Sequence, residues 1–178
     1  MEMVLAGNPG AFETLVRPYR QSLVGLAFRL TGNEEDAKEA AQEALMRAFR
    51  YLRGFDRNQS FRNWLLRILV NAVRKLAVKN TPAALPDNEA AIADPAAGPA
   101  DRYRHKELRS RLIDCLTVLG AREREVFLLR DLEERDIKET ARILGCSSVS
   151  VRVHLSAARR KIKDEMMTRY PGLLGADK

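Results

Sequence analysis

The residues with the most specific spacing form the segment DIKETARILGCSSVSVRVHLSAARRKIK, residues 136–163. Within it, Ala141, Gly145 and Val151 are separated by three and by five residues. A small residue at a helix crossing, a glycine in a short turn and a branched residue packing back fit two helices joined at a steep angle. The spacing predicts a helix-turn-helix whose second helix reads DNA, with an ordinary helical hairpin as the alternative.

The second helix of this segment has two different faces. With about 3.6 residues per turn, Val151, Leu155, Ala158 and Ile162 form one buried stripe. Small residues on the other faces permit close approach to base edges, and the Arg and Lys residues further along are able to reach phosphates. The residues that we expect to contact DNA are Ser148, Ser150, Arg152, Val153, His154, Ala157 and Arg160.

Composition bounds the class of protein. The 178 residues carry a net charge of +7, with a pI near 9.7, which favours a polyanionic partner. No apolar run approaches the roughly 20 residues of a membrane helix, and residues 1–4 have no signal-peptide pattern. We therefore expect a cytoplasmic protein without membrane insertion. Cys115 and Cys146 are expected to be unpaired thiols, and no residue spacing indicates a metal or cofactor site.

A proline-rich segment divides the chain. Residues 81–100, TPAALPDNEAAIADPAAGPA, hold four prolines and three acidic residues but no Lys or Arg. Proline at this density interrupts helices and denies donors to a sheet. We predict an extended acidic linker between basic domains at residues 1–80 and 101–178, with a surface loop inside one domain as the alternative.

Both domains are predicted to be all-α, each a small bundle of helices. Apolar residues recur at helical spacing over residues 12–30, with Pro18 expected to kink or divide that helix. A helix capped by Asn33 follows, with Leu45 and Phe49 assigned to the core, and then a loop over residues 54–59.

The third helix of the first domain is predicted to be capped by Ser60, and Trp64 is assigned to core packing. The second domain is predicted to hold a helix from about Leu108, another from about Ala121, and the two helices of the helix-turn-helix. Asp136 and Gly145 are expected to begin and end the first of that pair, and the last helix runs to about Tyr170.

Taken together, the two halves resemble the extracytoplasmic-function (ECF) group of the sigma-70 family of bacterial sigma factors. The resemblance covers nearly everything from Phe12 to Ile162. It is carried by FETLVRPYRQSLVGLAFRLTGNEEDAKEAAQEALMRAFRYLRGF and SFRNWLLRILVNAVRK in the first half. In the second half it is carried by LGAREREVFLLRDLEERDIKETARILGCSSVSVRVHLSAARRKI.

The resemblance implies a factor, not an enzyme, that binds core RNA polymerase and promoter DNA and is controlled by an anti-sigma factor. The implied polymerase contacts are the clamp helices of the largest catalytic subunit and the flap of the second-largest subunit. The residues implied to bind the clamp helices are Asp36, Glu39, Gln42, Glu43 and Arg47. The acidic linker resembles the segment that threads through the polymerase cleft.

The resemblance also divides the DNA contacts between the domains. The helix-turn-helix matches the reader of the −35 element. The loop after residue 55 and the helix behind it match the part that opens the −10 element and captures a flipped base. The residues implied to bind −10 DNA are Arg57, Asn58, Gln59, Ser60, Asn71, Arg74 and Lys75.

The chain departs from the usual family pattern in both halves. Ala40 replaces a frequently acidic residue of the docking helix. His154 and Ala157 stand where arginines are frequent, and Val149 where glycine is frequent, which leaves the −35 sequence open.

Two other functions remain open at this point: a helix-turn-helix regulator that binds operators unaided, and a sigma-like adaptor that sequesters an anti-sigma factor. No phosphate loop, HExxH motif or nucleophile elbow supports an enzyme.

Overall fold

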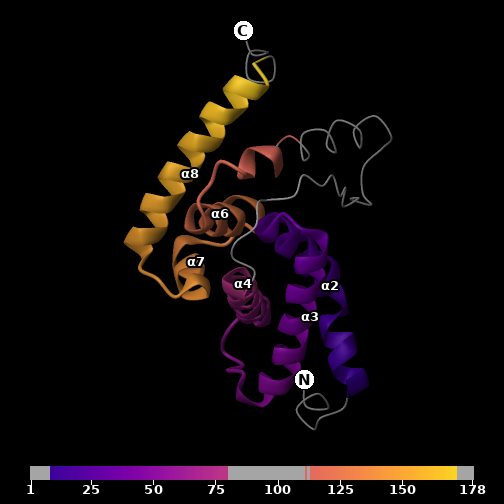
Figure 1. The fold of residues 1–178 in the computed structure, drawn as a ribbon. Coiled ribbons are helices and arrows are strands. Elements are labelled where there is room, and N and C mark those ends of the chain that lie inside the picture. The colour runs from indigo at the N-terminus through magenta and orange to yellow at the C-terminus, as the bar shows by residue number, and fades with distance from the viewer. Residues whose placement is uncertain (1–8, 80–110, 112, 172–178) are drawn as a thin grey trace, which may run out of the picture. The chain divides into compact units, whose positions relative to one another are not determined.

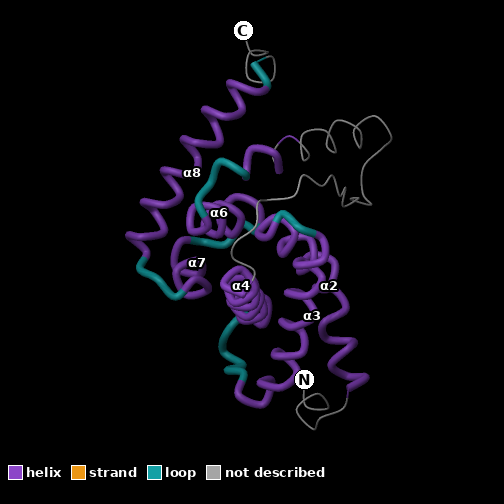
Figure 2. The backbone as a smooth tube through the Cα atoms, viewed as in Figure 1, coloured by secondary structure: helices purple, strands orange, loops and turns teal. Residues whose placement is uncertain are grey.

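The computed structural model describes residues 9–79, 111 and 113–171. Every regular element in these residues is a helix, so the all-α prediction is confirmed (Figures 1 and 2). The chain separates into two compact units. The predicted linker at residues 81–100 and the predicted helix start at Leu108 lie outside the described residues.

The N-terminal unit is a bundle of three long helices: α2 (Pro9–Thr31), α3 (Glu34–Tyr51) and α4 (Phe61–Lys79). A short 3-10 turn, η1 (Leu52–Gly54), follows α3 directly. Helix α3 packs against both α2 and α4. Its inward face is lined almost entirely by alanines, which allows close approach of its neighbours. The buried residues of this face are Ala37, Ala40, Ala41, Ala44 and Ala48.

Local sequence signals set the ends of these helices. The side chain of Asn33 accepts hydrogen bonds from the backbone N–H groups of Glu35 and Asp36, at 2.8 and 3.0 Å, as an N-cap should. The Ser60 hydroxyl accepts from the N–H of Asn63 at 3.3 Å. Pro18 lies inside α2 without dividing it.

The C-terminal unit contains a helical segment over residues 113–116, then α6 (Ala121–Phe127), a π-helical turn η2 (Leu128–Leu132), α7 (Ile137–Leu144) and α8 (Ser148–Arg169). Helix α8 packs along α6. The predicted inward stripe of α8 is confirmed, because Val151, Leu155, Ala158 and Ile162 are all buried.

Two core assignments in α3 are wrong. Phe49 is 40% exposed, and Leu45 is only half-buried. The alanines of α3 already fill the space against its neighbours, so the larger side chains of the helix lie at the edge of the contact. Trp64, also assigned to the core, is half-buried and packs among other aromatic rings.

Candidate nucleic-acid and protein interfaces

The helix-turn-helix is fixed by local hydrogen bonds. Asp136 and Glu139 form a reciprocal capping box: the Glu139 N–H donates to Asp136 Oδ1 at 2.7 Å, and the Asp136 N–H donates to Glu139 Oε2 at 3.0 Å. At the other end of α7, Gly145 has φ 66° and ψ 43°, the left-handed conformation that glycine adopts without steric penalty. The Ser147 hydroxyl then accepts from the N–H of Ser150 and starts α8. Both predicted caps of α7 are confirmed.

The predicted DNA-contact residues of α8 differ in their exposure. Arg152, Val153 and Arg160 are exposed, and Val153 is 61% accessible. The remaining four are half-buried at the sides of the helix: Ser148, Ser150, His154 and Ala157. The exposed three are therefore the members of the set that are best placed to touch a ligand first.

Two cations near the middle of α8 are held by carboxylates of the same unit. Arg159 makes a two-pronged ion pair with Asp131, with Nε–Oδ2 at 3.0 Å and Nη2–Oδ1 at 2.5 Å. Lys161 Nζ lies 2.7 Å from Glu123 Oε2. The sequence alone favoured both cations as phosphate ligands, but the structure gives them intramolecular partners. They tie α8 to η2 and to α6.

Glu123 has two tasks in this arrangement. Its Oε2 atom accepts from Lys161 and also from the backbone N–H of Gly120 at 2.9 Å, at the start of α6. The hydrogen bond from Lys161, followed by that from Gly120, outweighs partial burial and lowers the pKa of the Glu123 carboxyl. One carboxylate therefore caps α6 and anchors α8.

The turn between α6 and α7 contains a feature that the sequence did not reveal. At η2 the N–H of Glu133 donates to the carbonyl of Leu128, five residues earlier, at 2.9 Å. Glu134 then adopts a positive φ of 54°, which is uncommon for a residue with a side chain. The Arg130 guanidinium donates to the carbonyl of Arg135 across this turn. Asp131, the partner of Arg159, lies within this π-helical turn.

In the N-terminal unit, the predicted base-capture loop is organised by Asp56. Asp56 Oδ1 accepts from the N–H of Asn58 at 3.0 Å, and Oδ2 accepts from the Gln59 side-chain amide at 3.1 Å. These hydrogen bonds lower the pKa of the Asp56 carboxyl, and the bond from the Asn58 N–H has the largest effect. Arg57, Asn58, Gln59 and Ser60 are all exposed. Gln59, however, already uses its amide inside the loop.

An aromatic cluster anchors both ends of this loop. Phe55, which precedes the loop, is 9% exposed, and its ring centroid lies 5.5 Å from that of Phe61 and 5.0 Å from that of Trp64. Tyr19 of α2 extends the cluster, with its ring 5.7 Å from Phe61. The loop therefore projects polar side chains from a rigid apolar base.

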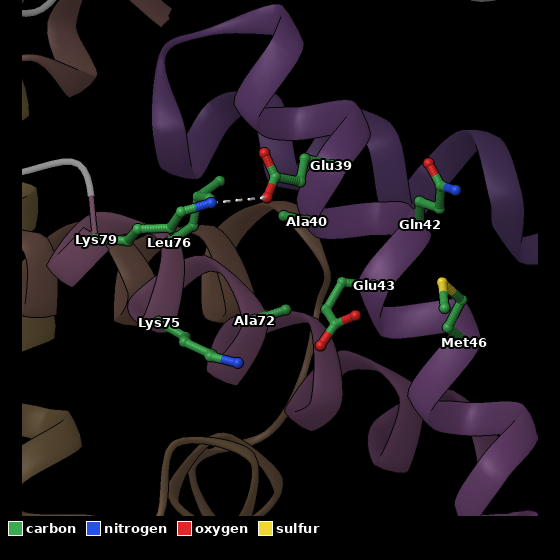
Figure 3. Close-up of a pocket in the computed structure, with 9 residues that line it drawn as sticks. All are labelled: Glu39, Ala40, Gln42, Glu43, Met46, Ala72, Lys75, Leu76 and Lys79. Carbon is green, nitrogen blue, oxygen red and sulfur yellow. Dashed lines mark ion pairs between the residues drawn. The ribbon is translucent and has the colours of Figure 1, made fainter.

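The predicted polymerase-binding residues of α3 lie beside a depression of about 390 Å³ between α3 and α4 (Figure 3). Glu39, Gln42 and Glu43 line it from α3, and the predicted DNA-binding residue Lys75 lines it from α4. Lys79 Nζ lies 3.9 Å from Glu39 Oε1, the ion pair drawn in Figure 3.

The rest of the two predicted sets is distributed along the helices. Glu43 also pairs with Arg47 at 2.6 Å, whereas Asp36 is half-buried in the first turn of α3. On α4, Asn71 is exposed beside the half-buried Arg74.

A second hollow, of about 620 Å³, lies between α2 and α3 and is more apolar. Phe12, Leu45 and Phe49 line it, and Gln42 and Met46 line both hollows. Met46 is 52% exposed. Sequence reasoning assigned Phe49 to the core and did not single out Met46, because helical spacing does not say how wide the buried stripe of a helix is.

In the part of the chain that the structure describes, nothing supports a metal site or a membrane-spanning helix. No group of three or more His, Cys, Asp or Glu side chains there is placed to hold a metal ion. None of the described helices is long and apolar enough to cross a membrane.

Comparisons with known proteins match both units. The family model for Sigma-70 region 2 matches residues 15–81, and that for Sigma-70, region 4 matches residues 109–162. The RNA polymerase sigma-E factor of Streptomyces avermitilis is 31% identical over 164 residues, covering 89% of this chain and 86% of that protein. The chain belongs to the ECF group of the sigma-70 family.

Two further comparisons show how far the likeness extends. The ECF RNA polymerase sigma factor SigG of Mycobacterium tuberculosis is 30% identical over an alignment of 178 positions, gaps included, that takes in 86% of this chain. The match covers 48% of SigG, so this ECF chain spans about half the length of that relative. Among solved structures, CnrH in complex with the cytosolic domain of CnrY has a TM-score of 0.67 and 25% identity, covering 94% of this chain and 95% of CnrH.

The region 2 match includes most of α2, all of α3 and α4, and the loop at Arg57–Ser60. The region 4 match includes the helix-turn-helix and ends at Ile162, the last buried residue of the α8 stripe. The ion pairs of α8 with Asp131 and Glu123 thus lie within the region 4 part of this ECF chain.

Proposed function

We propose that this ECF sigma factor binds core RNA polymerase, directs it to specific promoters and helps to open the −10 region. The observation that supports this most is the joining of a region 2 match and a region 4 match in one chain. Residues 1–80 would dock on the polymerase and open the −10 element. Residues 101–178 would read the −35 element, with residues 81–100 as the linker.

Docking on the polymerase would use the exposed face of α3. Glu39 and Gln42 supply polar groups there, and Met46 and Phe49 supply exposed apolar surface. Protein interfaces typically combine an apolar centre with a polar rim, and this face offers both. The proposed partner surface is the clamp helices of the largest catalytic subunit. The flap of the second-largest subunit would contact the C-terminal domain.

Opening of the −10 region would use the loop at Arg57–Ser60. Extruding a base costs a few kcal/mol, which stacking and hydrogen bonds in a protein pocket can offset. Arg57 and Asn58 are exposed for this task, with Ser60 beside them. Gln59 would have to exchange its bond with Asp56 for one with DNA. Asn71, Arg74 and Lys75 would then contact the adjacent duplex.

The proposal assigns the nucleotidyl-transfer chemistry to the polymerase, so this chain itself is not an enzyme. It also places the chain in the cytoplasm, where Cys115 and Cys146 would remain the free thiols seen in the structure. An anti-sigma factor is the proposed regulator. CnrH, with 25% identity, is held by the cytosolic domain of another protein, which supports a protein regulator here.

The decisive test is transcription by purified core RNA polymerase with and without this chain, on fragments of the source genome. Start sites that depend on the chain would support the proposal. DNA binding without any dependence on polymerase would favour a stand-alone regulator. Failure to bind core polymerase, with retained binding to an anti-sigma factor, would favour the adaptor.

The docking surface has a test of its own, with two methionines as a matched pair. Met46→Ala should weaken binding to core polymerase about tenfold, as expected for a residue at the centre of an interface. Met167→Ala is the control, because Met167 is 53% exposed on α8, outside the proposed docking face. Equal affinities of both variants would remove Met46 from the surface.

A further inference from the structure

The exposed face of α8 carries an apolar pair. Val149 is 65% exposed and Val153 is 61% exposed, and they stand four residues apart in the first two turns of the helix. Residues at this spacing are neighbours on one helix face. Among the described residues of the C-terminal unit, the other large apolar side chain with comparable exposure is Met167, at 53%.

This pair lies directly opposite the buried stripe of α8. With about 3.6 residues per turn, Val149, Val153, Ser156 and Arg160 fall on one line along the helix, away from the core. All four are exposed. The line therefore runs from two branched apolar side chains, through a hydroxyl, to a guanidinium.

The charges around the pair also limit what it can bind. Arg159 and Lys161 are engaged by Asp131 and Glu123. Arg152 and Arg160 are the exposed arginines that remain near the line, so the surface is apolar at its start and cationic beside and beyond it. Apolar contact with cationic flanks fits the major groove of DNA, where thymine methyl groups project between two phosphate backbones.

We propose that Val149 and Val153 form a reader of thymine methyl groups, and that this pair sets the base preference of the −35 element. The proposal rests on the proposed function, since it assumes that α8 enters the major groove. The residues at the start of a recognition helix are those that reach base edges, and both valines are there. Arg160, about two turns after Val153, would contact a phosphate.

The spacing of the valines makes the proposal specific. Four residues of helix rise by about 6 Å, and successive base pairs are about 3.4 Å apart. The two methyl groups should therefore belong to thymines about two base steps apart, on either strand. Removing one methyl contact should weaken binding about fourfold, the transfer free energy of one CH2-sized group.

The test uses the complete holoenzyme and a promoter that it transcribes in the run-off assay. Each thymine of the −35 segment is replaced in turn by uracil, which keeps all hydrogen-bonding groups and lacks only the methyl. Affinity is measured for the wild-type chain and for Val149→Ala, Val153→Ala and the control Met167→Ala. Both valines are exposed and alanine is the better helix former, so these variants should fold.

The expected result is a loss of about fourfold for uracil at each of two positions. Val149→Ala should abolish the loss at one position and Val153→Ala at the other, with the Met167→Ala chain behaving as wild type. A −35 segment without thymine, or a uracil effect that is absent or unchanged in both valine variants, would overturn the inference while promoter-specific transcription upholds the proposed function. If the chain directs no transcription, the proposed function and this inference are both wrong.

Discussion

The two candidate DNA-contacting regions are held in place in different ways. Helix α8 is fixed along its length by a buried stripe and by two ion pairs to carboxylates far away in sequence, Asp131 and Glu123. The loop at Arg57–Ser60 is held by aromatic packing at its ends and by local hydrogen bonds, chiefly to the carboxylate of Asp56. A helix that reads an intact duplex needs a preset orientation, whereas a loop that receives an extruded base needs exposed side chains free to rearrange.

The anchor of the loop gives the largest expected effect. Phe55→Ala should destabilise the N-terminal unit by about 3 kcal/mol, because it removes a buried aromatic ring and leaves a cavity. Phe49→Ala is the matched control and should cost much less, since Phe49 is 40% exposed. Trp64 is the single tryptophan of the chain, so its fluorescence during urea unfolding reports on this unit. Equal losses of stability in the two variants would mean that Phe49 is a core residue.

The turn before α8 gives the next effect. Gly145→Ala should destabilise the C-terminal unit by about 1–2 kcal/mol, because an L side chain is strained in the left-handed conformation. Gly54→Ala is the control: open space surrounds both glycines, and only Gly145 has a positive φ. Amide hydrogen exchange in α8 measures the Gly145 variant, and Trp64 fluorescence during urea unfolding measures the Gly54 control. An unaffected Gly145→Ala chain would mean that the turn adopts another conformation.

The local carboxylate of the loop should matter for DNA opening more than for stability. Asp56→Ala should weaken opening of the −10 region about fivefold, because the loop loses the acceptor that holds the Asn58 N–H and the Gln59 amide. Asp56→Asn keeps an acceptor for the N–H of Asn58 and should retain most of the activity. Permanganate reactivity of unpaired thymines measures the opening. If both variants open the promoter equally well, Asp56 does not organise the loop in the complex.

Neighbouring arginines of α8 test whether the ion pairs keep cations away from DNA. Arg160→Ala should reduce the slope of log affinity against log salt by about 0.9, the value for one phosphate contact. Arg159→Ala should leave this slope nearly unchanged, since Asp131 already binds that guanidinium. A reduced slope for Arg159→Ala would show that the ion pair opens on DNA binding.

The smallest effect concerns pH. Glu123 has a lowered pKa in the folded chain, so its contribution is present above its unfolded pKa and is lost as the pH falls through the folded value. Stability of the C-terminal unit should therefore decline in acid less steeply in Glu123→Gln than in the wild type. Denaturant unfolding at several acidic pH values, followed by hydrogen exchange in α8, measures this. Identical acid profiles would show that Glu123 makes no net contribution.

Much of the fold could be predicted because its signals are local. The caps at Asn33, Asp136 and Gly145 act on backbone atoms within a few residues, and the stripe of α8 follows from helix geometry. The order of residues along the chain was also enough to reveal the resemblance to a sigma factor. The exposed positions of α3 were harder to predict. The buried alanines of this helix make its buried stripe narrower than the helical spacing of its apolar residues suggests.

The sequence by itself determined the helices, their caps and the family, since these depend on neighbours along the chain. Only the tertiary structure decided which charges are already paired and which apolar residues remain exposed. Arg159 and Arg160 are adjacent and chemically identical, yet Asp131, 28 residues before Arg159, distinguishes them. The physical reason is that an ion pair depends on distance in space, which folding sets and chain order does not.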